Sequence, residues 1–184
     1  MGHSTLGANM IRNAEVFATA AHAAVKQKRN YTGEPYIVHP RAVADLVAIS
    51  RHHTWRHIVL AWLHDTVEDT GVTHSVIEEM FGKDISQALW FLTNVEATFD
   101  NRASRHLENT KRLASAPGWV KTVKVADIYD NTRDIIKVAP AFAPQYLQEK
   151  QHTMQVLKDC DDHILWALVN EQIVKQQMEL LDVA

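Results

Sequence analysis

Apolar residues recur along most of this chain with the spacing of one face of an α-helix. Between residues 10 and 28 they stand three or four positions apart, as at Ile11, Ala14, Ala18, Ala21 and Val25. No stretch alternates between apolar and polar residues over six positions, and no Asn-Gly or Asp-Gly pair marks a β-hairpin. This pattern predicts an all-α fold.

Short polar or turn-forming segments divide the pattern into helices. The 184 residues include only 6 Gly and 5 Pro, which is typical of long helices joined by short loops. Thr73 is expected to cap the start of a short helix that Gly82 ends, and Asp161 to cap the last helix. The expected helices span residues 10–28, 41–49, 55–67, 74–81, 84–97, 103–115, 118–136, 141–159 and 161–181.

The length of the chain suits one compact domain, which we place at residues 10–184. Residues 1–9 show no periodicity and are expected to form a flexible leader or a non-native remnant. Cys160 is the single cysteine, so an internal disulfide is excluded, and this fits the reducing cytoplasm. No apolar run reaches the roughly 20 residues that cross a bilayer, so no membrane association is expected. A net charge of -3 argues against a nucleic-acid partner but permits a local basic pocket, and the sequence leaves the oligomeric state open.

The strongest local signal for chemistry is the segment His64-Asp65-Thr66-Val67-Glu68-Asp69, at the end of the most apolar expected helix. Its four ionisable side chains are costly to bury unless they pair with one another or bind a cation. On a continuous helix, His64 and Glu68 share one face, and Asp65 and Asp69 share the adjacent face. Imidazole plus carboxylate is a ligand set for Mn²⁺, Fe²⁺ or Zn²⁺. A solvated helix end with internal ion pairs is the alternative interpretation.

Two further segments supply side chains of the same kind. His39 stands between a polar loop and an apolar helix, and Asp127 is the first carboxylate after a largely apolar stretch. Taken alone, each is explained as a structural residue. Together with His64 and Asp65 they form a complete set of four protein ligands, with room for water or phosphate oxygens.

In this order along the chain, His39, His64-Asp65 and Asp127 resemble the H…HD…D pattern of the HD-domain metal phosphohydrolases. The flanking segments TGEPYIVHP, LHDTVEDT and VKVADIYDNTRD are similar to the hydrolase domain of the RelA/SpoT-homologue family, over roughly residues 10–160. Free-standing members of that family, among them the metazoan SpoT homologues, are small alarmone hydrolases. The resemblance implies an HD-domain helical bundle. We expect a stand-alone hydrolase, because 184 residues leave no room for a synthetase domain.

The resemblance also implies roles for individual residues. His39, His64, Asp65 and Asp127 match the family's metal ligands, which usually hold one Mn²⁺ ion. Glu68 and Asp69 match the acidic pair that positions and activates the attacking water. The implied reaction removes the 3′-pyrophosphate of (p)ppGpp, giving GDP or GTP and pyrophosphate. The chemistry agrees, because a carboxylate one turn from His64 can take a proton from a water whose pKa a divalent ion has lowered.

A nucleotide with two diphosphate groups needs local cations on this acidic chain. Basic residues that could supply them are Lys28, Arg29, Lys111, Arg112, Lys121 and Lys124. Either Lys28 or Arg29 can be the basic residue that the family places in its first loop, and the planar guanidinium is better suited to stack on a base. The later nucleotide contacts of the family are matched by Asn131, Arg133, Tyr146 and Lys150. An ordinary solvated charge is the alternative for each lysine, and a core residue is the alternative for Tyr146.

One segment departs from the family pattern. Where family members usually carry Lys or Arg, then Leu, then an aromatic residue or His, this chain has Ile128, Tyr129 and Asp130. One positive charge is lost and one negative charge is gained beside the expected site. The base preference and the number of phosphates are therefore open, and (p)ppApp is an alternative substrate.

Two other functions also stay open. A different HD-type phosphohydrolase, such as an NADPH 2′-phosphatase or a nucleotidase, would use the same metal centre but release orthophosphate. A non-catalytic module that binds an alarmone would be expected to have lost a metal ligand or the Glu68-Asp69 pair. Neither is lost in this sequence.

Overall fold

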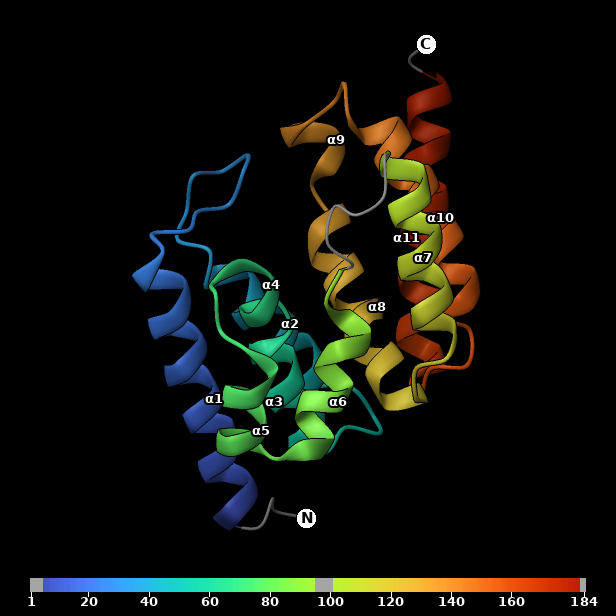
Figure 1. Ribbon diagram of the computed structural model, residues 1–184. Helices are drawn as coiled ribbons and strands as arrows, with labels where there is room; N and C mark the ends of the chain where they lie inside the picture. The colour runs from blue at the N-terminus through green and yellow to red at the C-terminus, as the bar shows by residue number, and fades with distance from the viewer. Residues whose placement is uncertain (1–4, 95–100, 183–184) are drawn as a thin grey trace.

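The computed structural model describes residues 5–94 and 101–182, and within these residues the chain forms helices and no β-strand (Figure 1). This confirms the all-α prediction. None of the described helices combines the length and the apolarity that crossing a bilayer requires. The helices are α1 (Thr5–Ala24), α2 (Val38–Ala48), α3 (Trp55–Leu63), α4 (Thr66–Asp69), α5 (His74–Phe81), α6 (Lys83–Leu92), α7 (Arg102–Ala114), α8 (Gly118–Thr132), α9 (Ile135–Val138), α10 (Ala143–Val156) and α11 (His163–Asp182).

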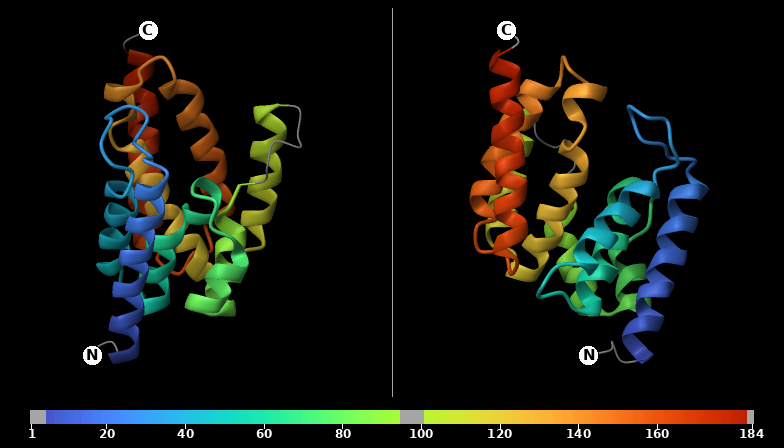
Figure 2. Two further views of the ribbon diagram at one scale, coloured as in Figure 1. Left: turned by 60° about the vertical axis from the view of Figure 1, so that its left-hand side comes forward. Right: turned by 180° about the vertical axis from the view of Figure 1, so that it is seen from behind.

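Helices α3 and α8 form the centre of the molecule. Every residue of α3 from His57 to Leu63 is buried, and α3 packs against α1, α2, α6 and α8. Helix α8 also packs against α2, α10 and α11. Figure 1 and the right-hand view of Figure 2 show α1 to α5 on one side of the molecule and α10 and α11 on the other, with α8 between them. Polar residues on α2, α3 and α8 can therefore meet where the two sides join.

The first helix begins earlier than the periodicity predicts. Helix α1 starts at Thr5, so the expected flexible leader is wrong for residues 5–9, and residues 1–4 lie outside the described residues. Gly7 is buried on this first turn, and a Cβ atom there would lie 3.0 Å from the side chain of Trp55. The missing side chain lets α1 lie close against the start of α3, which is a tertiary contact without a local sequence signal.

Two helices that we expected to be continuous are broken. The helix expected at 55–67 stops at Leu63 and restarts at Thr66. Two side chains replace the backbone donors at this break, because the His64 Nδ1–H donates to the Ala61 carbonyl oxygen and the Thr66 hydroxyl donates to the Leu63 carbonyl oxygen. The helix expected at 118–136 stops at Thr132, whose carbonyl oxygen accepts from Gln176 Nε2 of α11 at 2.7 Å.

The expected caps are only partly correct. Thr73 does cap α5, because its hydroxyl accepts from the Val76 N–H. Asp161 does not cap α11. The neighbouring Asp162 accepts from the N–H groups of Ile164 and Leu165 instead. The helix expected at 84–97 ends at Leu92, and residues 95–97 of that prediction lie outside the described residues.

Helix α1 ends in a Schellman motif, which is the commonest way to satisfy the last carbonyls of a helix. The Gln27 N–H donates to the His22 carbonyl oxygen at 3.1 Å, and the Lys26 N–H donates to the Ala23 carbonyl oxygen at 3.0 Å. The motif needs a left-handed residue between them, and Lys26 takes this conformation with φ 53°. A lysine at a position that favours glycine holds backbone strain.

Replacing Lys26 by Gly is therefore expected to stabilise the protein. A left-handed residue with a side chain costs roughly 1–2 kcal/mol, and glycine avoids this cost. Glycine also has more conformational freedom in the unfolded chain, which offsets part of the stabilisation. We expect a net increase of about 0.5–1 kcal/mol in the free energy of unfolding. Urea denaturation of both proteins measures it, and a less stable Gly variant would contradict the assignment of strain.

Candidate metal centre and adjoining cavity

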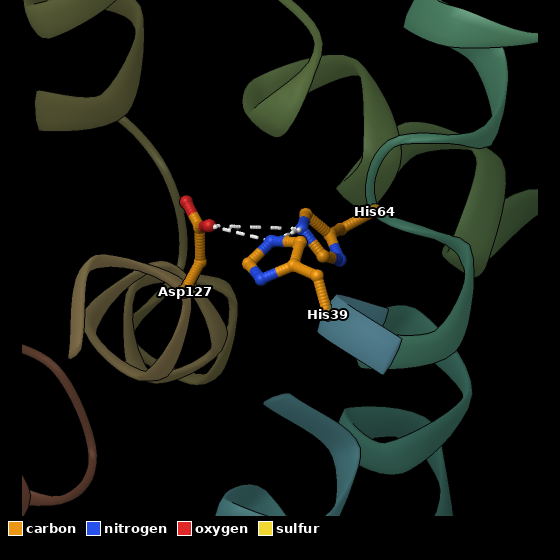
Figure 3. A group of neighbouring side chains, drawn as sticks. All are labelled: His39, His64 and Asp127. Atoms are coloured by element: carbon orange, nitrogen blue, oxygen red, sulfur yellow. Dashed lines mark hydrogen bonds and ion pairs between the residues drawn. The ribbon is translucent and has the colours of Figure 1, made fainter. Parts of the chain in front are cut away.

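Three buried side chains from distant parts of the chain meet between the two sides of the bundle. Figure 3 shows His39 from α2, His64 from the end of α3 and Asp127 from α8 turned toward one another. His39 Nε2 lies 3.1 Å from His64 Nε2 and 3.1 Å from Asp127 Oδ1, and His64 Nε2 lies 3.7 Å from Asp127 Oδ1. Asp65 joins them, because its Oδ2 lies 2.9 Å from His64 Nε2 and 3.6 Å from His39 Nε2.

Each imidazole is held by its other nitrogen. His39 Nδ1 lies 2.6 Å from Asp130 Oδ2, and His64 Nδ1 lies 2.8 Å from the Ala61 carbonyl oxygen. Both partners can only accept, so both Nδ1 atoms carry protons, and in the neutral rings the Nε2 lone pairs face the cluster. Metal-binding histidines are commonly held in this way by a carboxylate or a backbone carbonyl.

The spacing and charge of these atoms fit a divalent cation. Donor atoms at about 2.1 Å from one ion stand about 3 Å apart, close to the separations seen here. Burial alone would raise the pKa of Asp127, but Lys124 and the two histidines hold that pKa well below its ordinary value. Burial alone would lower the pKa of His64, yet the neighbouring carboxylates Asp65 and Asp127 raise it well above its ordinary value. Asp65 and Asp127, as ionised carboxylates, therefore favour positive charge in the space between these residues.

The acidic pair that follows lies beside this cluster, but it is held by other partners. Glu68 is exposed, and its two oxygens accept from the Asn94 N–H and the Asn94 side-chain amide at 2.9 and 2.8 Å. Asp69 is half-buried, and its Oδ2 accepts from Gln27 Nε2 at 2.9 Å. The helix break separates His64, at the end of α3, from Glu68 on α4, so these two do not share one continuous helix. Asp65 and Asp69 do stand one turn apart, because the Asp69 N–H donates to the Asp65 carbonyl oxygen at 2.9 Å.

A cavity of about 570 Å³ adjoins the cluster and opens between the loop after α1 and the helices α8, α9 and α10. This volume is typical of a small-molecule site. Four of the nucleotide-contact candidates line it, namely Arg29, Asn131, Arg133 and Tyr146. Asn131 connects the cavity to the cluster, because its Oδ1 accepts from Arg29 Nη1 at 3.0 Å and its Nδ2 donates to Asp127 Oδ1 at 2.5 Å.

The structure does not bring the remaining basic candidates to the cavity wall. Lys28 is exposed, Lys111 pairs with Glu108 on its own helix, and Arg112 stacks on the Trp90 ring. Lys121 is 2% exposed and pairs with Asp159, 38 residues away.

The last two basic candidates, Lys124 and Lys150, do not line the cavity either, but Lys124 contacts the cluster and Lys150 contacts a residue of the cavity wall. Lys124 Nζ lies 2.7 Å from Asp127 Oδ2, and Lys150 Nζ lies 4.8 Å from the centre of the Tyr146 ring. Burial and the charge of Lys124 lower the pKa of Lys150 to about 8. Both lysines are therefore placed to meet a negative group that reaches the cluster from the cavity.

Sequence reasoning missed three residues of this region. Arg102 lines the cavity, where it forms two hydrogen bonds of 2.7 Å to Glu149 and lies over the Phe142 ring. Tyr36 donates its hydroxyl to Asp65 Oδ2 at 2.6 Å, and the position of Tyr36 three residues before His39 was the available signal. Asp130 was noted only as an added negative charge. It binds His39 and lies near Arg29 and Arg133, so cations surround it.

Comparisons with known proteins agree with this geometry. The model of the HD domain family matches residues 14–158. The chain is 33% identical over 139 residues to a guanosine-3′,5′-bis(diphosphate) 3′-pyrophosphohydrolase of Aquifex aeolicus, covering 73% of this chain and 19% of that protein. It is 31% identical over 134 residues to the bifunctional (p)ppGpp synthase/hydrolase SpoT of Escherichia coli, covering 71% of this chain and 18% of that protein. The chain thus spans about a fifth of the length of these curated relatives.

The fold is also similar to solved structures. A metazoan orthologue of SpoT, described as hydrolysing ppGpp, superimposes with a TM-score of 0.80 at 22% identity, over 91% of this chain and 95% of that chain. A protein of Listeria monocytogenes superimposes with a TM-score of 0.64 at 19% identity, over 81% of this chain and 99% of that chain. At these identities, the similarity describes the fold.

Proposed function

This chain belongs to the HD-domain family, and from that premise we propose that it is a metal-dependent hydrolase that removes the 3′-pyrophosphate of (p)ppGpp, with (p)ppApp as an additional or alternative substrate. The products are GDP or GTP, or their adenine counterparts, and pyrophosphate. The observation that carries this proposal is the convergence of two histidines and two aspartates beside a cavity lined with arginines and aromatic rings. The curated relatives with this activity support the choice of substrate.

The residues that would hold the ion are His39, His64, Asp65 and Asp127, and we propose one Mn²⁺ per site. Two imidazole nitrogens and two carboxylate oxygens suit Mn²⁺, which accepts both kinds of donor. A divalent ion held there would polarise a phosphoryl oxygen and lower the pKa of a water molecule. Tyr36 and Asp130 would keep Asp65 and His39 in place, since each forms a 2.6 Å hydrogen bond to its ligand.

Glu68 and Asp69 are the proposed water-handling pair. Both follow Asp65 by one turn of α4, and both carboxylates have their present hydrogen bonds on residues outside the metal cluster. A carboxylate within reach of the attacking water can accept its proton and direct its lone pair at the phosphorus. Lys124 and Lys150 would stabilise the negative charge that is transferred to the leaving pyrophosphate.

The cavity has the features of a nucleotide site. Arg29, Arg102 and Arg133 supply positive charge, and Tyr36, Phe142 and Tyr146 supply rings against which a base can stack. We propose that Asn131 positions the nucleotide next to the metal centre, because it contacts Asp127 and Arg29 together. The proposed partner is thus a small nucleotide in the cytoplasm, rather than a nucleic acid or a membrane.

Arg29 and Lys28 form a matched pair for testing this cavity. Arg29 lines it and bonds Asn131, whereas the neighbouring Lys28 is exposed and does not line it. We expect Arg29→Ala to raise KM for the nucleotide about tenfold or more, the value of one or two hydrogen bonds to a charged group. Lys28→Ala should change KM by less than about twofold. Steady-state kinetics of both variants decide this, and equal KM values would contradict the assignment.

Product analysis tests the proposed reaction. Metal-free protein is reloaded with Mn²⁺ and offered ppGpp, ppApp and NADPH in parallel. Pyrophosphate from ppGpp or ppApp supports the proposal, and the ratio of the two rates gives the base preference. Orthophosphate from NADPH alone would make the substrate wrong while keeping the metal centre. Binding of ppGpp without any product would indicate a non-catalytic module.

A further inference from the structure

Gln27 connects the end of α1 to the proposed water-handling pair. Its Nε2 lies 2.9 Å from Asp69 Oδ2, 42 residues away in the sequence, and its Oε1 lies 2.6 Å from His22 Nδ1. His22 is only 1% exposed, so this contact is closed to water. A half-buried amide thus joins a buried imidazole to a carboxylate beside the metal centre.

The chemistry of its two partners fixes the orientation of this amide. An ionised Asp69 carboxylate can only accept hydrogen bonds, so the end of Gln27 that faces it must be the NH₂ group. The carbonyl end then faces His22, and a carbonyl can only accept, so His22 must carry its proton on Nδ1. The structure has this arrangement, and it leaves His22 Nε2 buried without a hydrogen-bond partner.

The backbone at the end of α1 brings His22 and Gln27 together. In the Schellman motif, Gln27 is the residue whose N–H returns to the His22 carbonyl oxygen, so their side chains leave the backbone side by side. The motif is kept although Lys26 must adopt a left-handed conformation at φ 53°. Strain that a fold retains next to a functional site indicates a constraint on the geometry there.

His22 also supports the other side of the metal cluster. Its ring lies 4.8 Å from the Tyr36 ring, and Tyr36 donates its hydroxyl to Asp65 Oδ2. The buried His22 ring therefore contacts both Tyr36, which bonds Asp65, and Gln27, which bonds Asp69. An ordinary helix end at the surface would need neither contact.

From these contacts we propose that Gln27 is a positioning residue for Asp69, and that His22 fixes the amide of Gln27 in the orientation this requires. The inference rests on the proposed function, in which Asp69 handles the attacking water. Gln27 does not reach the cavity, so its action goes through the position of the Asp69 carboxylate. Loss of the contact should therefore slow the chemical step and leave nucleotide binding unchanged.

Two substitutions at position 27 separate the contact with Asp69 from the contact with His22. Gln27→Glu keeps an acceptor for His22 but turns a negative oxygen, in place of the NH₂ group, toward Asp69. Gln27→Leu removes both contacts. We expect kcat to fall by about 10- to 100-fold in each variant, with KM within about twofold of the wild type. Lys26→Gly is the matched control, since it keeps the turn and both side chains, and its kcat should stay at the wild-type value.

The histidine tautomer gives a readout that does not depend on turnover. In protein labelled with ¹⁵N-histidine and free of metal, His22 should show the Nδ1–H tautomer, and Gln27→Leu should lose that signal. A wild-type kcat in both position-27 variants, or a rise in KM with kcat unchanged, would overturn the inference while leaving the proposed function intact. If the wild type hydrolyses none of the nucleotides, the proposed function is wrong. Absence of the Nδ1–H tautomer of His22 would separately contradict the proposed orientation of the Gln27 amide.

Discussion

Asp65→Ala is expected to abolish metal binding and turnover together while the protein stays folded. The Asp65 carboxylate lies 2.9 Å from His64 Nε2 and 3.6 Å from His39 Nε2, so its removal takes away one of two negative charges in the cluster. Loss of a partner that merely orients a ligand costs about 10- to 100-fold in metal affinity or activity. Loss of the ligand itself should therefore lower Mn²⁺ affinity and kcat by ~10³-fold or more.

The fold should tolerate this change, because the Asp65 side chain is 19% exposed and follows the buried part of α3. Bound Mn²⁺ measured by calorimetry, pyrophosphate release and the far-UV circular dichroism spectrum check the three parts of the prediction. Tyr36→Phe is the matched control, since it removes only the hydroxyl that donates to Asp65. The loss of Mn²⁺ affinity or of kcat in Tyr36→Phe should stay within about 100-fold. Full turnover by Asp65→Ala would mean that the cluster is not the metal centre of the reaction.

The residues of the cluster could be found from the sequence because burying them is costly. His39, His64 and Asp127 each stand next to an apolar stretch, where an unpaired polar side chain needs a partner. In the structure all three are buried, and their potential ligand atoms lie within 4.8 Å of one another. The order of the three segments also matched a known family pattern. Both kinds of signal can be read from the sequence without knowledge of the tertiary structure.

The helix breaks could not be found in the same way. The apolar residues on either side of each break keep helical spacing, as Leu63 and Val67 do at the first and Ile128 and Ile135 at the second. At each break a side chain donates to a backbone carbonyl of the last helical turn. At Thr132 that side chain is Gln176, which lies 44 residues further along the chain. A contact of this range depends on how α11 packs against α8, which no local pattern contains.

Four residues of the cavity wall, Arg29, Asn131, Arg133 and Tyr146, were predicted because each stands in a segment that resembles the family pattern. Asn131 and Arg133 follow Asp127 on α8 and the turn after it, and both line the cavity. Arg102 also lines it, but its contacts with Phe142 and Glu149 join α7 to α10 across about 40 residues. A charge on an exposed helix looks the same in the sequence whether it faces water or a substrate, so Lys111 and Arg112 were predicted and Arg102 was not.

The second large effect is expected for Glu68→Gln. If Glu68 accepts the proton of the attacking water, its neutral isostere should bind Mn²⁺ and nucleotide normally and lose turnover by ~10²–10⁴-fold, the usual contribution of a general base. Glu68 is exposed and forms no contact with the ligand atoms of the cluster, so the affinity for metal should stay within about threefold. Single-turnover kinetics at saturating ppGpp measure the chemical step, and calorimetry measures the metal.

Asn94 and Asp69 make this prediction specific. In the structure, both Glu68 oxygens accept from Asn94, once from its backbone and once from its side chain. Asn94→Ala keeps the carboxylate and the backbone bond, so its rate should fall by less than about tenfold. If Glu68→Gln retains the wild-type rate and Asp69→Asn does not, the base is Asp69. The half-buried Asp69 would suit that role, because its burial, together with the charges of Asp65 and Glu68, raises its pKa above the ordinary value despite the Gln27 hydrogen bond, and a base with a higher pKa takes up a proton more readily.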